Sequence, residues 1–134
     1  MRQLLTRFFA LMLIAVVGLT GCNSAGVSGQ MSGDYRQDTL TVIDGLRSAI
    51  TLPAGDPEQA ATEANARNLI NDFSALYRRD NAVSSLSSFS TLRTALNALA
   101  GHYSSYPNRP IPDKLKNRLE QEFKQVEAAL NRGA

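Results

Sequence analysis

Hydrophobic side chains recur at three- and four-residue spacing in four stretches of this chain, at about residues 34–50, 57–79, 89–106 and 112–132. This spacing places the apolar residues on one face of a helix and leaves the other face polar. Runs of alternating β-branched residues, which indicate strands, are missing from the sequence. The pattern therefore predicts an all-α protein.

Residues typical of helix ends separate these stretches. Asp56 can cap the second helix, with Pro57 at its first position and Gln59 where the partner of a capping box belongs. Pro53 ends the first helix, and Gly133 suits the C-cap of the last. The sequence thus predicts four separate helices.

Two glycines lie inside predicted helices, where glycine is less favourable than alanine by about 1 kcal/mol. Gly45 weakens the first helix unless close packing requires it, and a close contact is the expected reason for Gly101. The first turns of the second helix are rich in alanine, which lets a neighbouring helix approach.

The connections between the helices are short. Residues 80–88 form a polar connection in which we expect Val83 and Leu86 to cover the core. Residues 106–112 contain Pro107, Pro110 and Pro112, which make this connection stiff and extended. We therefore predict an antiparallel up-down-up-down four-helix bundle over residues 33–134.

The N-terminus has the features of an export signal. An apolar run over residues 8–19 follows Arg2 and Arg7 and ends in Leu19-Thr20-Gly21-Cys22. This ending resembles the bacterial lipoprotein box, in which cleavage leaves an acylated cysteine as the first residue. We expect residues 1–21 to be a lipoprotein signal peptide and Cys22 to be lipidated; the alternative is an ordinary secretory signal. The run is too short for a membrane span of roughly 20 residues.

Residues 22–32 are predicted to form a lipidated flexible tether, because they are rich in Ser and Gly and carry no charge. The tether includes Met31 and would hold the domain near a membrane. Without Arg2 and Arg7 the basic and acidic residues are equal in number, although the whole chain has 14 Lys and Arg against 12 Asp and Glu. A neutral domain does not favour nucleic-acid binding.

Candidate catalytic and metal chemistry is sparse. His102 is the only histidine, and neither Glu-x-x-His nor Cys-x-x-Cys-His occurs, so no pattern predicts a metal or haem site. The serines near residues 84–90 do not form the Gly-x-Ser-x-Gly turn of a hydrolase. We expect no cofactor, no metal and no enzymatic activity.

Several motifs resemble those of a known family. Residues 33–40 read GDYRQDTL, residues 69–73 LINDF, residues 77–80 YRRD and residues 119–123 LEQEF. Residues 94–112 read TALNALAGHYSSYPNRPIP, which is too unusual a string to expect by chance. The chain closely resembles the photosystem II assembly and repair lipoproteins of the psb twenty-seven family, in their cyanobacterial lipidated form. The resemblance covers essentially the whole domain after Cys22.

This resemblance implies a monomeric helical bundle, lipid-anchored on the lumenal side of the thylakoid membrane. It implies binding to photosystem II assembly intermediates, mainly at the lumenal loop of the smaller chlorophyll-binding inner antenna. It further implies help with maturation of the manganese cluster before the extrinsic subunits bind. The alternative function is a membrane-tethered bundle that carries a small ligand or a metal ion.

Exposed arginine and aromatic side chains are the usual anchors of protein interfaces. On this basis the candidate partner-binding residues are Arg78, Arg79, Asp80, Tyr103, Tyr106, Asn108 and Arg109. The first three could instead be solvated charges at a helix end, and the others could pack the proline-rich corner. Both interpretations remain open from the sequence alone.

Overall fold

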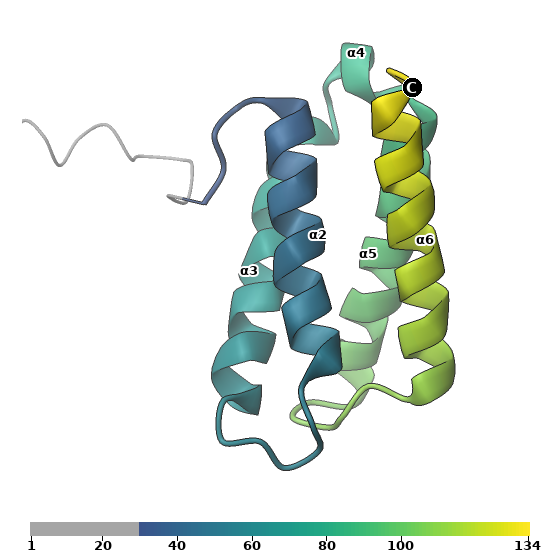
Figure 1. The fold of residues 1–134 in the computed structure, drawn as a ribbon. Helices are drawn as coiled ribbons and strands as arrows, with labels where there is room; N and C mark the ends of the chain where they lie inside the picture. The colour runs from purple at the N-terminus through teal and green to yellow at the C-terminus, as the bar shows by residue number, and fades with distance from the viewer. Residues whose placement is uncertain (1–29) are drawn as a thin grey trace, which may run out of the picture.

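The computed structural model describes residues 30–134, and the predicted signal peptide, Cys22 and most of the tether lie outside the described residues. This part of the chain is all-helical, so the predicted fold class is confirmed there (Figure 1). Four long helices and one short helix follow one another along the chain. They are α2 (Tyr35–Thr51), α3 (Gln59–Tyr77), α4 (Asn81–Ser84), α5 (Ser87–Ser105) and α6 (Asp113–Asn131).

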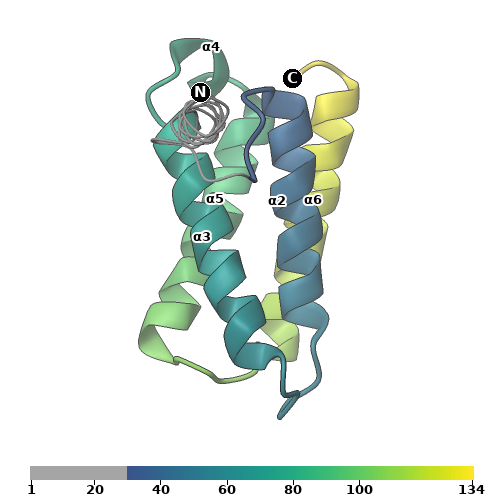
Figure 2. The same ribbon diagram turned by 90° about the vertical axis from the view of Figure 1, so that its left-hand side faces the viewer.

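The four long helices lie side by side, with α4 and the C-terminus at one end of the molecule (Figures 1 and 2). α3 packs mainly on α2, and α5 packs mainly on α6. The apolar faces of all four meet in one core, in which each buried Leu, Ile or Phe contributes roughly 1.5–3 kcal/mol. Its fully buried side chains include Val42, Leu46, Leu69, Phe73, Leu92, Leu99, Leu119 and Phe123.

Both α2 and α3 begin close to an aspartate, and α3 begins two residues later than predicted. Asp34 caps α2, because its Oδ1 accepts a hydrogen bond from the Gln37 N–H at 2.8 Å. Asp56, predicted as the cap of the second helix, instead accepts from the Glu58 N–H at 2.8 Å within a turn. The helix itself begins at Gln59, whose N–H donates to the Asp56 carbonyl at 3.1 Å. The aspartate therefore caps the turn that leads into α3 rather than α3 itself.

The two helical glycines have different surroundings. A Cβ on Gly45 would collide with Cδ1 of Leu69 on α3, so close packing between α2 and α3 accounts for this glycine, the case that the sequence left open. A Cβ on Gly101 would meet nothing within 4 Å, so the predicted close contact at Gly101 is wrong. Gly101 lies on the exposed side of α5.

The connection predicted for residues 80–88 contains the short helix α4. Asp80 caps it by accepting a hydrogen bond from the Ala82 N–H at 3.0 Å. Val83 is buried and Leu86 packs against the core, which confirms their predicted positions over it.

The last residues of the predicted tether pack against the helices. Met31 is buried, and Gln30 donates a hydrogen bond from its amide to Asn65 of α3 at 3.1 Å. The sequence analysis placed Met31 in the tether because its neighbours are small and polar. None of the helices in the described region is long and apolar enough to cross a membrane.

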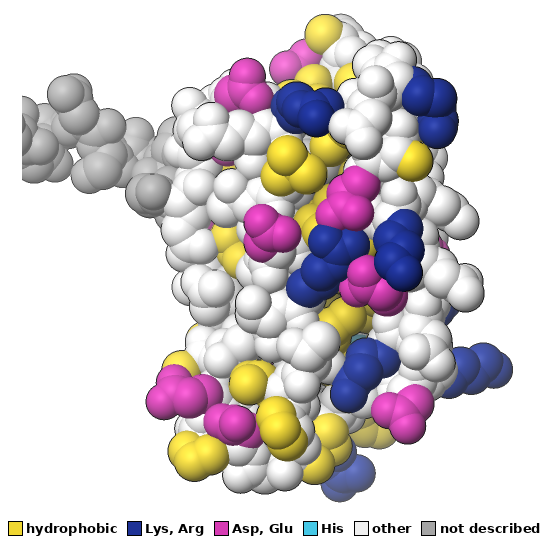
Figure 3. All heavy atoms as spheres, viewed as in Figure 1, with side chains coloured by type: hydrophobic (Ala, Val, Ile, Leu, Met, Phe, Trp, Pro, Cys, Tyr) yellow, Lys and Arg dark blue, Asp and Glu magenta, His cyan; other side chains and the backbone are white. Residues whose placement is uncertain are grey.

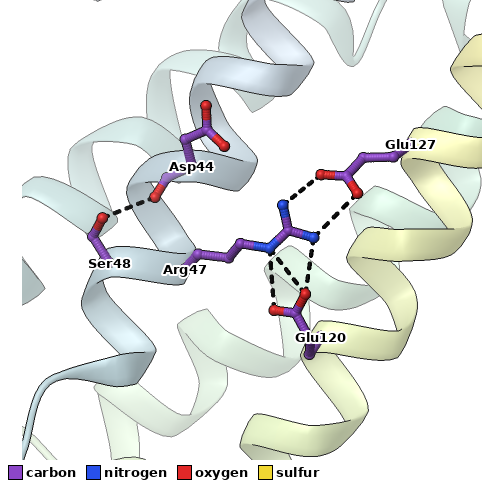
Figure 4. A network of polar contacts seen from close by, with 5 residues as sticks. All are labelled: Asp44, Arg47, Ser48, Glu120 and Glu127. Atoms are coloured by element: carbon purple, nitrogen blue, oxygen red, sulfur yellow. Dashed lines mark hydrogen bonds and ion pairs between the residues drawn. The ribbon is translucent and has the colours of Figure 1, made fainter.

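Arg47 links α2 to α6 (Figure 4). Its guanidinium forms ion pairs with Glu120 and Glu127 and lies 5.9 Å from the ring centre of Phe123. Glu120 accepts hydrogen bonds from Arg47, although the four-residue spacing of Glu120 and Lys124 on α6 would also suit a pair within the helix. Basic and acidic side chains are accordingly intermixed on the face that α2 and α6 present in Figure 3.

Candidate docking surface

The end of α3 presents two exposed arginines. Arg78 is the C-cap residue of α3, and Arg79 follows it immediately. Among the described residues, neither side chain has a hydrogen-bond or ion-pair partner. Positive charge at this position is also favourable for the carbonyl end of the helix. Both guanidinium groups are therefore accessible to a partner.

Asp80 has a structural role beside these arginines. Its carboxylate is exposed but accepts the N–H of Ala82 and so begins α4. α4 in turn places Val83 over the core. The aspartate therefore supports the shape of this end of the molecule.

The opposite end carries the proline-rich connection between α5 and α6 (Figure 1). Tyr106 is 51% exposed, the most exposed large hydrophobic side chain of the described region, and its ring lies 5.4 Å from that of His102. Arg109 is exposed three residues later. Asn108 has a φ of 58°, a left-handed conformation that asparagine tolerates better than most residues. The Arg109 N–H donates a hydrogen bond to the Tyr106 carbonyl at 3.3 Å, so the turn through Asn108 keeps these two residues close in the backbone.

A buried glutamate fixes this connection to α3. Glu63 is 6% exposed, and its carboxylate accepts hydrogen bonds from the Asn108 N–H at 3.0 Å and from Arg67 at 2.9 Å. Arg67 also donates to the carbonyl of Tyr103 at 2.6 Å. The sequence analysis missed this network; the only local signal is the four-residue spacing of Glu63 and Arg67. The long-range partner, a backbone N–H in a loop, leaves no pattern in the sequence.

Tyr103 is a core residue rather than a surface one. It is 3% exposed, and Arg67 lies 5.8 Å from the centre of its ring. Burial, with the nearby charge of Glu63, raises the pKa of Tyr103 to about 12. Of the two interpretations that the sequence leaves open for Tyr103, its burial favours packing over contact with a partner.

The remaining candidates form two separate patches. Arg78 and Arg79 lie beside α4, whereas Tyr106, Asn108 and Arg109 lie in the connection at the other end of the long helices (Figure 1). A small partner surface could not cover both patches at once. This separation agrees with the predicted antiparallel arrangement, in which the C-terminal ends of two consecutive helices lie at opposite ends.

A second buried carboxylate anchors the segment that leads into α2. Asp38 is fully buried and accepts hydrogen bonds from Tyr77 at 2.5 Å, from the Ser32 N–H and hydroxyl at 2.7 Å and from the Gly33 N–H at 3.0 Å. Burial by itself would raise the pKa of Asp38, but these hydrogen bonds together hold it below its ordinary value. Asp38 thus joins α2, the end of α3 and the segment that precedes α2.

Metal-binding geometry is not present in the described part of the chain. No group of three or more His, Cys, Asp or Glu side chains there is placed to hold a metal ion. Nε2 of His102 is buried without a hydrogen-bond partner, but its ring lies against Tyr106 rather than beside carboxylates.

The comparisons with known proteins identify the family. The family model described as Photosystem II Pbs27 matches residues 2–130. This chain belongs to that photosystem II family. The resemblance found in the sequence motifs is thereby confirmed.

Members of this family are similar to the chain over nearly its whole length. The photosystem II assembly factor lipoprotein Psb27 of Thermosynechococcus vestitus is 60% identical, over 93% of this chain and 92% of the relative. The photosystem II lipoprotein Psb27 of a Synechocystis strain is 48% identical, over 99% of this chain and 97% of the relative. A solution structure of Psb27 from cyanobacterial photosystem II matches with a TM-score of 0.75 and 51% identity, over 80% of this chain and 94% of that one.

Proposed function

We propose that this chain is an assembly and repair factor of photosystem II. The observation that carries the proposal is the family match over residues 2–130, together with 60% identity to a protein named as an assembly factor of that complex. The helical structure supports a binding role, because its exposed arginines and Tyr106 are typical interface residues. The protein acts by occupying a surface of the immature complex and performs no catalysis.

The chain is anchored through Cys22 on the lumenal side of the thylakoid membrane after residues 1–21 are removed. Two relatives are named as lipoproteins, which supports a lipidated cysteine here. The four long helices form one antiparallel bundle, which is monomeric when free. A tether that begins at Cys22 connects this bundle to the membrane.

The anchor is tested with Cys22→Ser in a cyanobacterial host. We expect the variant to lose labelling by a radioactive fatty acid and to leave the membrane fraction, while the parent chain keeps both. Ser24→Ala, in the same segment, is the control and should remain labelled. Unchanged labelling of the Cys22 variant would contradict the anchor.

The partner is the smaller chlorophyll-binding inner antenna, contacted at its lumenal loop in assembly intermediates. Binding there assists maturation of the manganese cluster and ends when the extrinsic subunits arrive. The contact residues include Arg78 and Arg79, or Tyr106, Asn108 and Arg109, whose accessibility supports a docking role. The two patches lie at opposite ends of the long helices, so only one of them is central to the contact.

Crosslinking mass spectrometry of the full-length chain on purified intermediates tests the partner and the patch together. Crosslinks from one end of the helices to the lumenal loop of the smaller antenna are expected. Crosslinks only to other subunits would contradict the partner. Equal crosslinks from both ends to that loop would contradict the use of a single patch.

A further inference from the structure

A groove runs between α3 and α5, the two helices that pack mainly on other neighbours. It encloses about 280 Å³, and its walls include residues of both helices. Small side chains keep it open, because Ser74 of α3 and Ala100 of α5 stand where larger residues would fill the space. Figure 2 shows α3 and α5 as neighbours on this side of the molecule.

The floor of the groove is apolar and already formed. Phe73 and Phe89 lie there with their rings stacked, 6.3 Å apart between centres and 27° between planes. Leu96 completes this floor. All three side chains are held in the core, at most 4% exposed, so they close the bottom of the groove and fix its shape. The partly exposed Ser74 and Ala100 above them are the surface that a ligand would meet.

The rim of the groove is basic. Arg78 and Arg93 both line it and are exposed, and no acidic residue is among the residues that line it. In the described part of the chain neither arginine has an ion-pair partner. The α2 and α6 face differs, because Arg47 there is already paired with Glu120 and Glu127. The charge of the groove is therefore unbalanced within the protein.

A smaller hollow extends the groove along the same two helices. It encloses about 170 Å³ and shares Ile70, Asn71 and Ala100 with the larger one. The two hollows follow one another along α3 and α5, and this elongated arrangement suits successive side chains of an extended segment.

We propose that the α3/α5 groove binds an acidic segment of the partner protein, with a carboxylate paired to Arg78 or Arg93 and a small adjacent side chain seated between Ser74 and Ala100. The inference rests on the proposed function for the nature of the partner. We expect an acidic segment because the arginines of the rim complement its charge, and arginine pairs with carboxylates through two parallel hydrogen bonds. A small apolar neighbour of that carboxylate is expected, because Ala100 is the partly exposed apolar side chain of the groove. Arg78 thereby belongs to a groove rather than only to the end of α3.

Charge removal tests the rim. The full-length chain with Arg78→Gln and Arg93→Gln is compared with Lys114→Gln and Lys124→Gln, which removes the same charge from exposed positions of α6. Co-isolation with photosystem II assembly intermediates should fall about tenfold for the groove variant and little for the α6 variant. Equal recovery of both variants would overturn the inference while leaving the proposed function intact. Failure of the unmodified chain to co-isolate would overturn the proposed function itself.

Filling the groove tests its apolar part without changing charge. Ala100→Phe places a ring in the space above the floor, and the same loss of co-isolation is expected. Gly101→Phe, at the next and outward-facing position of α5, is the control and should retain binding. Circular dichroism confirms that each variant keeps its helices. Retained binding by a folded Ala100→Phe chain would contradict docking in the groove.

Photocrosslinking identifies the occupant. A p-benzoylphenylalanine residue in place of Asn97, on the rim, is activated in the purified complex, and the captured material is analysed by mass spectrometry. The expected product is a peptide of a photosystem II subunit with Asp or Glu beside an apolar residue. Capture of an anionic lipid instead, or of a peptide without acidic residues, would overturn the inference.

Discussion

The hydroxyl of Tyr77 donates a hydrogen bond to Oδ2 of Asp38 at 2.5 Å, across 39 positions of sequence. The bond connects the last residue of α3 to the first turn of α2. The same carboxylate accepts hydrogen bonds from Ser32 and Gly33, so the segment leading from the predicted anchor is fastened to the helices. A force on the proposed tether would therefore act on the α2/α3 pair.

Tyr77 and Asp38 should make coupled contributions to the free energy of unfolding. Tyr77→Phe and Asp38→Asn are each expected to lower the free energy of unfolding by about 1–3 kcal/mol, because each leaves buried hydrogen-bonding groups without partners. Urea unfolding of both single variants and the double variant gives their interaction energy. The double variant should lose less than the sum of the two single losses, by about 1 kcal/mol. Strict additivity would show that the contact does not stabilise the fold.

Alkaline pH should destabilise the domain through its buried tyrosines. The pKa of Tyr103 is raised to about 12, chiefly by burial, and that of Tyr77 is raised by burial and by Asp38. A raised pKa means that the folded state holds the proton more tightly than the unfolded state does. The resulting stability is complete below the unfolded value of about 10 and is lost as the pH rises from there towards the folded value.

The check is chemical unfolding of the parent chain and Tyr103→Phe between about pH 8 and pH 12. The parent should lose stability more steeply than the variant above about pH 10, because the variant lacks one of the titrating groups. Parallel curves for the two proteins would exclude a contribution of Tyr103 to the alkaline loss.

The two helical glycines should respond oppositely to alanine. Gly101→Ala is expected to raise the free energy of unfolding by about 0.5–1 kcal/mol, since the added methyl meets open space and alanine favours the helix. Gly45→Ala is expected to lower it by about 1–2 kcal/mol, because the methyl collides with Leu69 in the core. Thermal unfolding of the two variants is the measurement. Stabilisation by both substitutions would show that α2 and α3 can move apart at little cost.

Arg47→Met tests the link between α2 and α6. The substitution keeps an apolar stem over Phe123 but removes both ion pairs and leaves Glu120 and Glu127 unpaired. We expect a loss of about 1 kcal/mol at low salt, a modest value because all three side chains are partly exposed to water. The loss should shrink in about 1 M salt, where such charges are screened. A loss independent of salt would assign the role of Arg47 to packing.

Local patterns predicted the helices but not the contacts between them. The 3.6-residue periodicity located all four long helices, because each buries one continuous apolar face. The start of α3 was misplaced, since Asp56 can cap either a turn or a helix and the sequence around it does not distinguish them. Gly45 and Gly101 look alike in sequence, and only the position of Leu69 separates them.

The candidate site was predictable only in part. The motif around Arg78 and Arg79 pointed correctly to exposed cations, because arginines at a helix end are rarely buried. For Tyr103 the sequence left packing and docking open, because the residue stands close to Tyr106 in a polar segment, while its helical phase turns it into the core. The roles of Asp38 and Glu63 depend on partners 39 and 45 positions away, which no local pattern encodes.

Native gel fractionation of solubilised thylakoid membranes tests the central claim most directly. The full-length tagged chain is expressed in a cyanobacterium that lacks its own family member, and its migration is compared with that of photosystem II subunits. We expect the chain to run with complexes that contain the smaller inner antenna but lack the extrinsic subunits. Migration only with the fully assembled dimer, or only as free protein, would contradict an assembly role.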